Sequence, residues 1–203
     1  DQLEVYSDLV AAKELSNDQK YYDLIDICNF DNVEDHKYIN GGRNDCERIG
    51  IIVDEMRNIV KDHNYKLNVI DVGSYDGCVS VPLLEKYSLY IDNLYAYDQS
   101  TDALNYFESN YKLTYNQINI INDNVMNIDK HDLDVNVVIV AELMEHIEDT
   151  MTFLNKLMSL VKTKCTFIFT TPAGPWQNLD KDNKHIEHLH HFEINDIKTI
   201  FKE

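Results

Sequence analysis

Two short stretches of the chain group residues whose types and spacing fit chemistry on a nucleotide-bearing ligand. In "LNVIDVGSYDGCVS", residues 67–80, an apolar strand pattern runs into a loop with Gly73 and Gly77, and an apolar helical pattern follows. A strand that passes through a glycine loop into a helix is typical of a nucleotide site. In "ELMEHIED", residues 142–149, carboxylates flank an imidazole, and both groups move protons in general acid-base catalysis.

The glycine loop does not fit a pyrophosphate. A dinucleotide site uses three glycines in the spacing G-x-G-x-x-G, whereas this loop has two, and Asp76 places a carboxylate where the anion would lie. No Gly-Lys-Ser/Thr follows the loop, which excludes a Walker phosphate loop. The loop suits instead a ligand with a ribose, an amino acid and a positive charge.

At this point the sequence resembles the class I S-adenosylmethionine (SAM)-dependent methyltransferases. Their first motif is an acidic residue, any residue, Gly, three residues and Gly, which "DVGSYDG" matches at Asp71, Gly73 and Gly77. The resemblance covers roughly residues 65 to 200. It implies SAM as the cofactor, and it implies that Ser74 and Tyr75 of the loop contact it.

Two later strand ends extend the resemblance. After "LYAYDQS" the family's acidic residue, which holds both ribose hydroxyls, falls on Asp98, with Gln99 beside it. Its distance from the loop agrees with the geometry of nucleotide-binding sheets. After "INIIND" the resemblance makes Asp123 the acceptor for the adenine amino group, with Asn124 and Val125 beside the ring.

The stretch after the fourth predicted strand resembles the Glu-x-x-Glu-His pattern of ubiquinone-pathway and sugar O-methyltransferases. It supplies Glu142, Glu145 and His146 as the predicted catalytic residues. If the stretch begins a helical turn, the three share one face. His146 is then the candidate base, because histidine exchanges protons near neutral pH, and either glutamate would orient it or the acceptor. The alternative is a histidine that packs beneath the site or caps the turn.

A metal is a second interpretation of the same residues. Glu142, Glu145 and His146 with His190 form a donor set for magnesium or manganese, and the small-RNA 3′-end methyltransferases resemble this pattern. The same blocks also occur in relatives that use no metal, so we predict none. A third interpretation is a non-catalytic binding module of a longer protein.

The segment after the fifth predicted strand is where this fold usually builds its acceptor wall. It contains a histidine cluster, of which we expect at least one member to line the acceptor pocket, and Pro175 with Trp176, which fit an apolar lid or stacking face. Near the N-terminus, Arg43 is a candidate partner for the cofactor's carboxylate. The cluster consists of His185, His188, His190 and His191.

The composition limits the class of protein. The 203 residues carry a formal net charge of -18, which repels nucleic acid and anionic membrane surfaces. The four scattered cysteines are typical of a reduced intracellular protein. No apolar run approaches the roughly 20 residues of a membrane span, and no signal-peptide core is present. We expect a soluble, cytoplasmic protein with no membrane partner.

The elements that must position these residues alternate along the chain. The patterns predict a helix over 45–63, strands over 66–73, 93–98, 118–123, 135–143 and 165–172, and helices over 77–87, 101–112 and 149–162. This order predicts an α/β doubly wound, mostly parallel sheet in a Rossmann-like methyltransferase domain over 45–203. Residues 1–44 are expected to form an N-terminal helical extension.

One feature of the family is expected to be absent from the predicted sheet. The sequence stops at "IFKE", where the usual C-terminal strand hairpin would begin, so we expect either one part of a longer protein or a trimmed fold. Such an edge needs a cover, for example a second copy in a homodimer or further domains of a longer chain. Taken together, the residues predict a SAM-dependent O-methyltransferase that acts on a small molecule, a sugar or nucleotide-linked sugar first and a phenol second.

Overall fold

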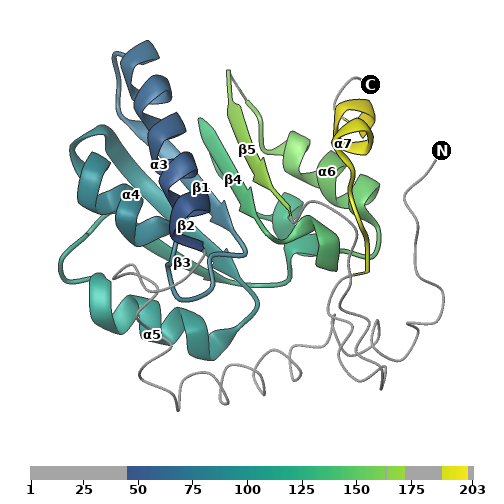
Figure 1. Cartoon of the computed structure of the whole chain (residues 1–203). Coiled ribbons are helices and arrows are strands. Elements are labelled where there is room, and N and C mark those ends of the chain that lie inside the picture. The colour runs from purple at the N-terminus through teal and green to yellow at the C-terminus, as the bar shows by residue number, and fades with distance from the viewer. Residues whose placement is uncertain (1–44, 163, 172–188, 201–203) are drawn as a thin grey trace.

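The computed structural model describes residues 45–162, 164–171 and 189–200. The expected N-terminal extension, residues 1–44, lies outside this part of the chain. Figure 1 shows helices packed on both faces of one central sheet. Among the described helices, none is long and apolar enough to cross a membrane.

Five parallel strands form the sheet in the order β3-β2-β1-β4-β5. Asp71 of the central strand pairs with Ala96 of β2 on one side and with Ile139 of β4 on the other. Because β1 lies at the reversal of strand order, its carboxyl end faces the crevice in which open α/β sheets bind ligands. The strands are β1 (Leu67–Val72), β2 (Ile91–Asp98), β3 (Ile118–Asn122), β4 (Val137–Ala141) and β5 (Thr166–Thr170).

The helices cover the two faces as a parallel sheet requires, because both faces must be buried. Val69 and Ile139 belong to the core under α3, α4 and α5, whereas Ile70 and Val138 belong to the core under η4, α6 and α7. The α-helices are α3 (Asp45–Asp62), α4 (Ser80–Tyr87), α5 (Thr101–Tyr111), α6 (Thr150–Ser159) and α7 (Ile194–Ile200). The 3-10 helices are η3 (Ser88–Tyr90), η4 (Val125–Lys130) and η5 (Met144–His146).

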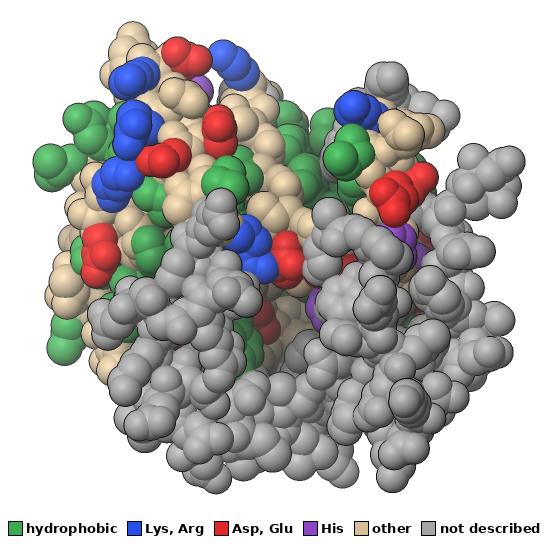
Figure 2. Space-filling view, viewed as in Figure 1, with side chains coloured by type: hydrophobic (Ala, Val, Ile, Leu, Met, Phe, Trp, Pro, Cys, Tyr) green, Lys and Arg blue, Asp and Glu red, His purple; other side chains and the backbone are tan. Residues whose placement is uncertain are grey.

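Polar side chains just before α5 and α6 fix where these two helices begin. The Ser100 hydroxyl accepts from the Ala103 amide and starts α5, and the Asp149 carboxylate accepts from the Thr152 amide and starts α6. Away from the crevice, charged side chains of both signs meet on α3 and α4, where Asp54 accepts from Arg57 and Lys86 (Figure 2). The order of the parallel strands and the helices on both faces of the sheet confirm the expected doubly wound α/β fold.

Candidate functional site

The loop between β1 and α4 is held in a shape that depends on glycine. Gly73 has φ +78°, Tyr75 has φ +49° and Gly77 has φ +88°, so three of five consecutive residues are left-handed. The amides of Gly73 and Ser74 both donate to the Tyr97 carbonyl of β2, at 2.8 and 3.2 Å. The loop is thereby fastened over the end of the neighbouring strand.

Close packing also requires the two glycines. A Cβ atom on Gly77 would lie 2.6 Å from the Phe107 ring of α5. A Cβ atom on Gly73 would lie 3.2 Å from the side chain of Leu143, which follows β4. The loop therefore passes close to the elements on both sides of it. Ser74 and Gly77 of the loop do not line the pocket described below.

Asp98 ends β2 and faces the pocket. Its carboxylate is largely buried and accepts from the Tyr75 amide at 2.9 Å and from the Ser100 amide at 2.8 Å. Burial raises the pKa of Asp98, and these backbone hydrogen bonds oppose that rise. A carboxylate held in this way is preorganised to accept from the two hydroxyls of a ribose.

Asp71 lies beneath the loop and does not line the pocket. It is 1% exposed and accepts from the Ser80 hydroxyl at 2.6 Å. Burial raises the pKa of Asp71 to about 7, and the Ser80 hydrogen bond opposes this rise. Its visible contact is thus to the start of α4, where it supports the loop from below.

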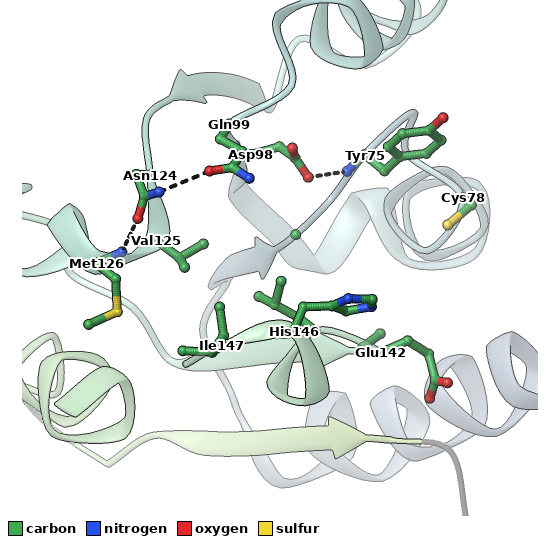
Figure 3. A pocket seen from close by; sticks show the side chains of 13 residues that line it. Tyr75, Cys78, Asp98, Gln99, Asn124, Val125, Met126, Glu142, His146 and Ile147 are labelled. Atoms are coloured by element: carbon green, nitrogen blue, oxygen red, sulfur yellow. Dashed lines mark hydrogen bonds between the residues drawn. The ribbon is translucent and has the colours of Figure 1, made fainter. Parts of the chain in front are cut away.

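The loop after β3 forms the other end of the pocket (Figure 3). Asn124 caps η4 by accepting from the Met126 amide at 2.9 Å, and its side-chain amide donates to Gln99 at 2.9 Å. Tyr97, buried in the core, donates its hydroxyl to the Asn124 carbonyl. With Val125 in the same lining, these contacts build an apolar slot next to Asp98.

The Asp123 side chain contacts its own loop and does not line the pocket. Its carboxylate accepts from the Asn127 side-chain amide at 2.8 Å and the Asn124 backbone amide at 2.7 Å, and it lies 3.0 Å from Nε2 of His131. These contacts, led by the Asn127 hydrogen bond, lower the pKa of Asp123. Asp123 does not line the pocket, so its predicted contact with an adenine amino group stays a prediction.

The turn after β4 differs from the helical turn considered for the sequence. Glu142 adopts a left-handed conformation with φ +52°, and residues 144–146 form the 3-10 helix η5. Glu142 and His146 line the pocket, whereas Glu145 does not. The three predicted catalytic side chains therefore do not share one face, because neighbours such as Glu145 and His146 point in different directions.

Glu145 is buried beneath the turn. Its carboxylate accepts from the Thr171 hydroxyl at 3.3 Å, and its carbonyl accepts from the amides of Leu189 and His190 at 2.7 and 3.1 Å. Burial raises the pKa of Glu145 to about 7, and the charge of Glu142 adds to the rise. Glu145 thus ties the end of β5 and the segment before α7 to the turn that carries His146.

An ion pair joins the same turn to the first described helix. Nη1 of Arg48 in α3 lies 3.0 Å from Oε2 of Glu142, and the side chains are 28% and 25% exposed. Left-handed backbone costs a residue with a side chain on the order of 1–3 kcal/mol, and such strain gathers at functional sites. Glu142 is therefore held in place by contacts beyond its own backbone preference.

The histidines do not assemble a metal centre in the part of the chain that the structure describes. His190 is buried with Nε2 3.1 Å from the Glu148 carbonyl, and His191 lies beside Glu193. Neither lines the pocket. Among the described residues, no group of three or more His, Cys, Asp and Glu is arranged to hold a metal ion. The predictions for Arg43, Pro175, Trp176, His185 and His188 fall outside these residues.

The pocket that these elements enclose has a volume of about 250 Å³. In Figure 3, Asp98 and Tyr75 stand on one side of it and His146 and Ile147 on the other. The sequence predictions missed five apolar or sulfur-bearing lining residues, although all five directly follow or precede a predicted one. The lining consists of Gly73, Tyr75, Cys78, Asp98, Gln99, Asn124, Val125, Met126, Ala141, Glu142, Leu143, His146 and Ile147.

The arrangement combines three chemical capacities. Asp98 offers a buried carboxylate to a diol, Val125, Met126 and Ile147 offer an apolar slot to a flat ring, and His146 offers a group that takes up a proton. All three act on one cavity at the carboxyl ends of β1, β2 and β4.

Comparisons with known proteins agree with this arrangement. The family model described as "Methyltransferase domain" matches residues 47–203. No curated protein matches the chain in sequence. Many solved structures share its fold. The three described next do so at low sequence identity.

Magnesium protoporphyrin IX methyltransferase from Synechocystis PCC 6803, solved with bound SAM, is 18% identical with a TM-score of 0.57, over 89% of this chain and 84% of that one. The YcgJ protein from Bacillus subtilis is 13% identical with a TM-score of 0.55, over 71% of this chain and 64% of that one. The plantazolicin methyltransferase BpumL, solved with S-adenosylhomocysteine (SAH), is 12% identical with a TM-score of 0.58, over 83% of this chain and 62% of that one. The chain thus spans less than two thirds of the length of the last two.

Proposed function

Since the chain belongs to the methyltransferase domain family, we propose that its pocket binds SAM and that it methylates a hydroxyl group of a small molecule. The first acceptor we propose is a sugar, free or linked to a nucleotide, and the second is a phenol. This preference rests on the resemblance of the Glu-x-x-Glu-His stretch. The observation that carries the proposal is that His146 and Asp98 line one pocket.

The described residues fit the cofactor. Asp98 would hold the ribose hydroxyls, since its carboxylate is buried and oriented by two backbone amides. Gly73 leaves the loop without a side chain at the pocket, so that a ligand can approach the backbone. Val125, Met126 and Ile147 would flank the adenine.

The chain's own residues contribute positioning, exclusion of water and proton uptake. When bound, SAM supplies a methyl group that its sulfonium has already activated. The pocket then has to hold the acceptor hydroxyl in line, exclude water, and take up the hydroxyl proton. His146 accepts this proton at a ring nitrogen. Glu145 acts indirectly, because it is buried and anchors the turn that carries His146.

Replacement of the base gives the direct test. We expect His146→Gln to lower kcat by about 10²- to 10⁴-fold, the usual contribution of a general base, while SAH affinity in calorimetric titration stays within about threefold. His63→Gln is the matched control, because His63 contacts the Ile59 carbonyl at the end of α3 and does not line the pocket. Full turnover in His146→Gln would show that the base is another group.

The acceptor is found by a screen with labelled SAM against nucleotide sugars, phenols and RNA ends. We expect label on a sugar hydroxyl, and SAH binding that Asp98→Ala abolishes. If the wild-type chain binds SAH but labels no acceptor, the non-catalytic binding module is the better interpretation. Absence of SAH binding in the wild-type chain would contradict the cofactor itself.

A further inference from the structure

The turn that carries His146 is held from outside by the segment before α7. At one end of the turn, the carbonyl of Glu145 accepts from the backbone amide of His190 at 3.1 Å. At the other end, the carbonyl of Glu148 lies 3.1 Å from Nε2 of the His190 ring. The residues between these two carbonyls are His146 and Ile147, and both line the pocket (Figure 3). His190 therefore contacts both ends of a stretch whose middle residues face the cavity.

The ring of His190 is placed for its contact with the turn. A carbonyl oxygen only accepts, so Nε2 carries a hydrogen and donates it to Glu148. His190 is 4% exposed, and its Nδ1 is buried with no hydrogen-bond partner among the described residues. A buried polar atom without a partner costs free energy, so an apolar side chain would fill this space at lower cost. The hydrogen bond to the turn, and not packing, accounts for a histidine at this position.

The segment around His190 is itself fixed by the core. Leu189 and Phe192 are both buried. Phe192 belongs to the same core cluster as Met144 and Ile147 of the turn, and its ring centroid lies 5.8 Å from that of His190. Because close-packed cores yield little, this shared packing sets the distance between the ring and the turn.

We propose that His190 is a positioning residue for methyl transfer, whose Nε2–H group holds the turn so that the His146 ring stays directed into the pocket. The inference rests on the proposed role of His146 as the base, and it holds for whichever acceptor is methylated. The sequence offered His190 as a metal donor, whereas here its Nε2 contacts the chain's own backbone. A displacement of about 1 Å in a catalytic group costs on the order of 10²-fold in rate.

Two amide substitutions separate the hydrogen bond from the rest of the side chain. The glutamine amide reaches as far as Nε2 of histidine, whereas the asparagine amide is one methylene shorter and leaves the Glu148 carbonyl without this donor. With labelled SAM and the acceptor found by the screen, we expect His190→Asn to lower kcat about 10- to 100-fold while the KM for SAM stays within about threefold. His190→Gln should restore most of the kcat, and His190→Leu, a second variant without the donor, should resemble His190→Asn.

A double substitution tests whether His190 acts through His146. In a His146→Gln background, we expect His190→Asn to change kcat by less than about twofold, because the group that it positions is already absent. A residue that only stabilises the fold would lower kcat in both backgrounds. His191→Asn is the matched control, since His191 is the next residue of the same segment, lies beside Glu193 and does not line the pocket. It should leave kcat unchanged.

The His146 ring is also observable without an acceptor. In NMR spectra of protein with isotope-labelled histidine rings, the His146 signal is the one that His146→Gln removes. We expect His190→Gln to keep the wild-type signal and His190→Asn to shift, broaden or split it, both with and without SAH.

The inference is overturned if His190→Asn keeps the wild-type kcat or the wild-type His146 signal. It is also overturned if His190→Asn lowers kcat equally in the wild-type and His146→Gln backgrounds, because the residue would then only support the fold. A wild-type chain that methylates no acceptor would instead contradict the proposed function, and the NMR spectra would still decide whether His190 positions the ring.

Discussion

Asp71 and Asp98 are buried carboxyl groups on neighbouring strands, yet their surroundings give them different tasks. Asp98 is oriented by backbone amides and faces the pocket. Asp71 is bound by a single hydroxyl beneath the loop, and burial raises its pKa to about 7. A carboxyl group with a raised pKa in the folded state opposes folding once the pH is high enough to ionise it.

The pH dependence of stability follows from Asp71. Between pH 4, near the pKa of an unfolded aspartate, and pH 7, the folded protein holds a proton that the unfolded chain has lost, so stability falls as pH rises. Asp71→Asn has no such proton. We expect its free energy of unfolding, relative to that of the wild type, to rise by about 2–4 kcal/mol between pH 5 and pH 8. Urea denaturation at the two pH values measures this difference.

Asp149→Asn is the control for this measurement. Asp149 is exposed, and hydrogen bonds from Thr152 lower its pKa, so its contribution is lost only as the pH falls below about 4. The difference in the free energy of unfolding between Asp149→Asn and the wild type should stay constant from pH 5 to pH 8. A constant difference for Asp71→Asn as well would contradict the raised pKa of Asp71.

The strand ends account for where several predicted site residues lie, although their roles stay predictions. Asp98 ends β2, Asn124 follows β3 and His146 lies in the turn after β4, and all three line the pocket. Glu145 and Asp123 do not line it, because local turns rotate their side chains. The left-handed Glu142 and the hydrogen bonds of Asp123 to its own loop set those directions, and no spacing rule in the sequence reports them.

At the scale of elements, the patterns predicted these strands and helices, with boundaries one to three residues from the observed ones at most ends. The predicted strand over 118–123 is observed as Ile118–Asn122, and the helix over 101–112 as Thr101–Tyr111. The helix predicted from residue 77 begins instead at Ser80. Gly77 has φ +88° and belongs to the loop, where it lies against Phe107 of α5, a contact between distant segments that local pattern does not reveal.

The packing of α5 against the glycine loop gives a stability prediction. Gly77→Ala places a methyl group 2.6 Å from the Phe107 ring at a backbone conformation that alanine disfavours. We expect a loss of about 3 kcal/mol in the free energy of unfolding, measured by chemical denaturation. Gly50→Ala is the matched control, since its Cβ meets nothing within 4 Å in α3, and it should gain up to about 1 kcal/mol. Equal effects of the two substitutions would contradict this account.

For the whole molecule, the excess of acidic residues opposes compactness. The chain carries a formal net charge of -18, and like charges on a folded surface repel one another. Salt screens this repulsion over about 10 Å at 0.1 M. The acidic balance is counted over the whole sequence, and the pocket lining contributes only Asp98 and Glu142 to it.

We therefore expect the Tm to rise by about 2–6 °C when NaCl increases from about 10 mM to 300 mM at pH 8, as followed by differential scanning fluorimetry. The same salt step at pH 5, where some carboxylates bind protons, should give a smaller rise. A Tm that stays constant or falls with salt at pH 8 would show that repulsion is locally compensated.

The position of β1 between β2 and β4 affects how the chain folds while it is being synthesised. Asn68 at the start of β1 bonds to Asn136, 68 positions further along the chain. At about 5–20 residues per second, the ribosome needs roughly 3–14 s to make that distance. Once β2 has been made, β1 has a partner on that side and an open, apolar edge on the other until β4 follows, and open edges recruit strands from other chains. The central strand of the finished sheet is thus an exposed edge during synthesis, and slower translation lengthens that exposure.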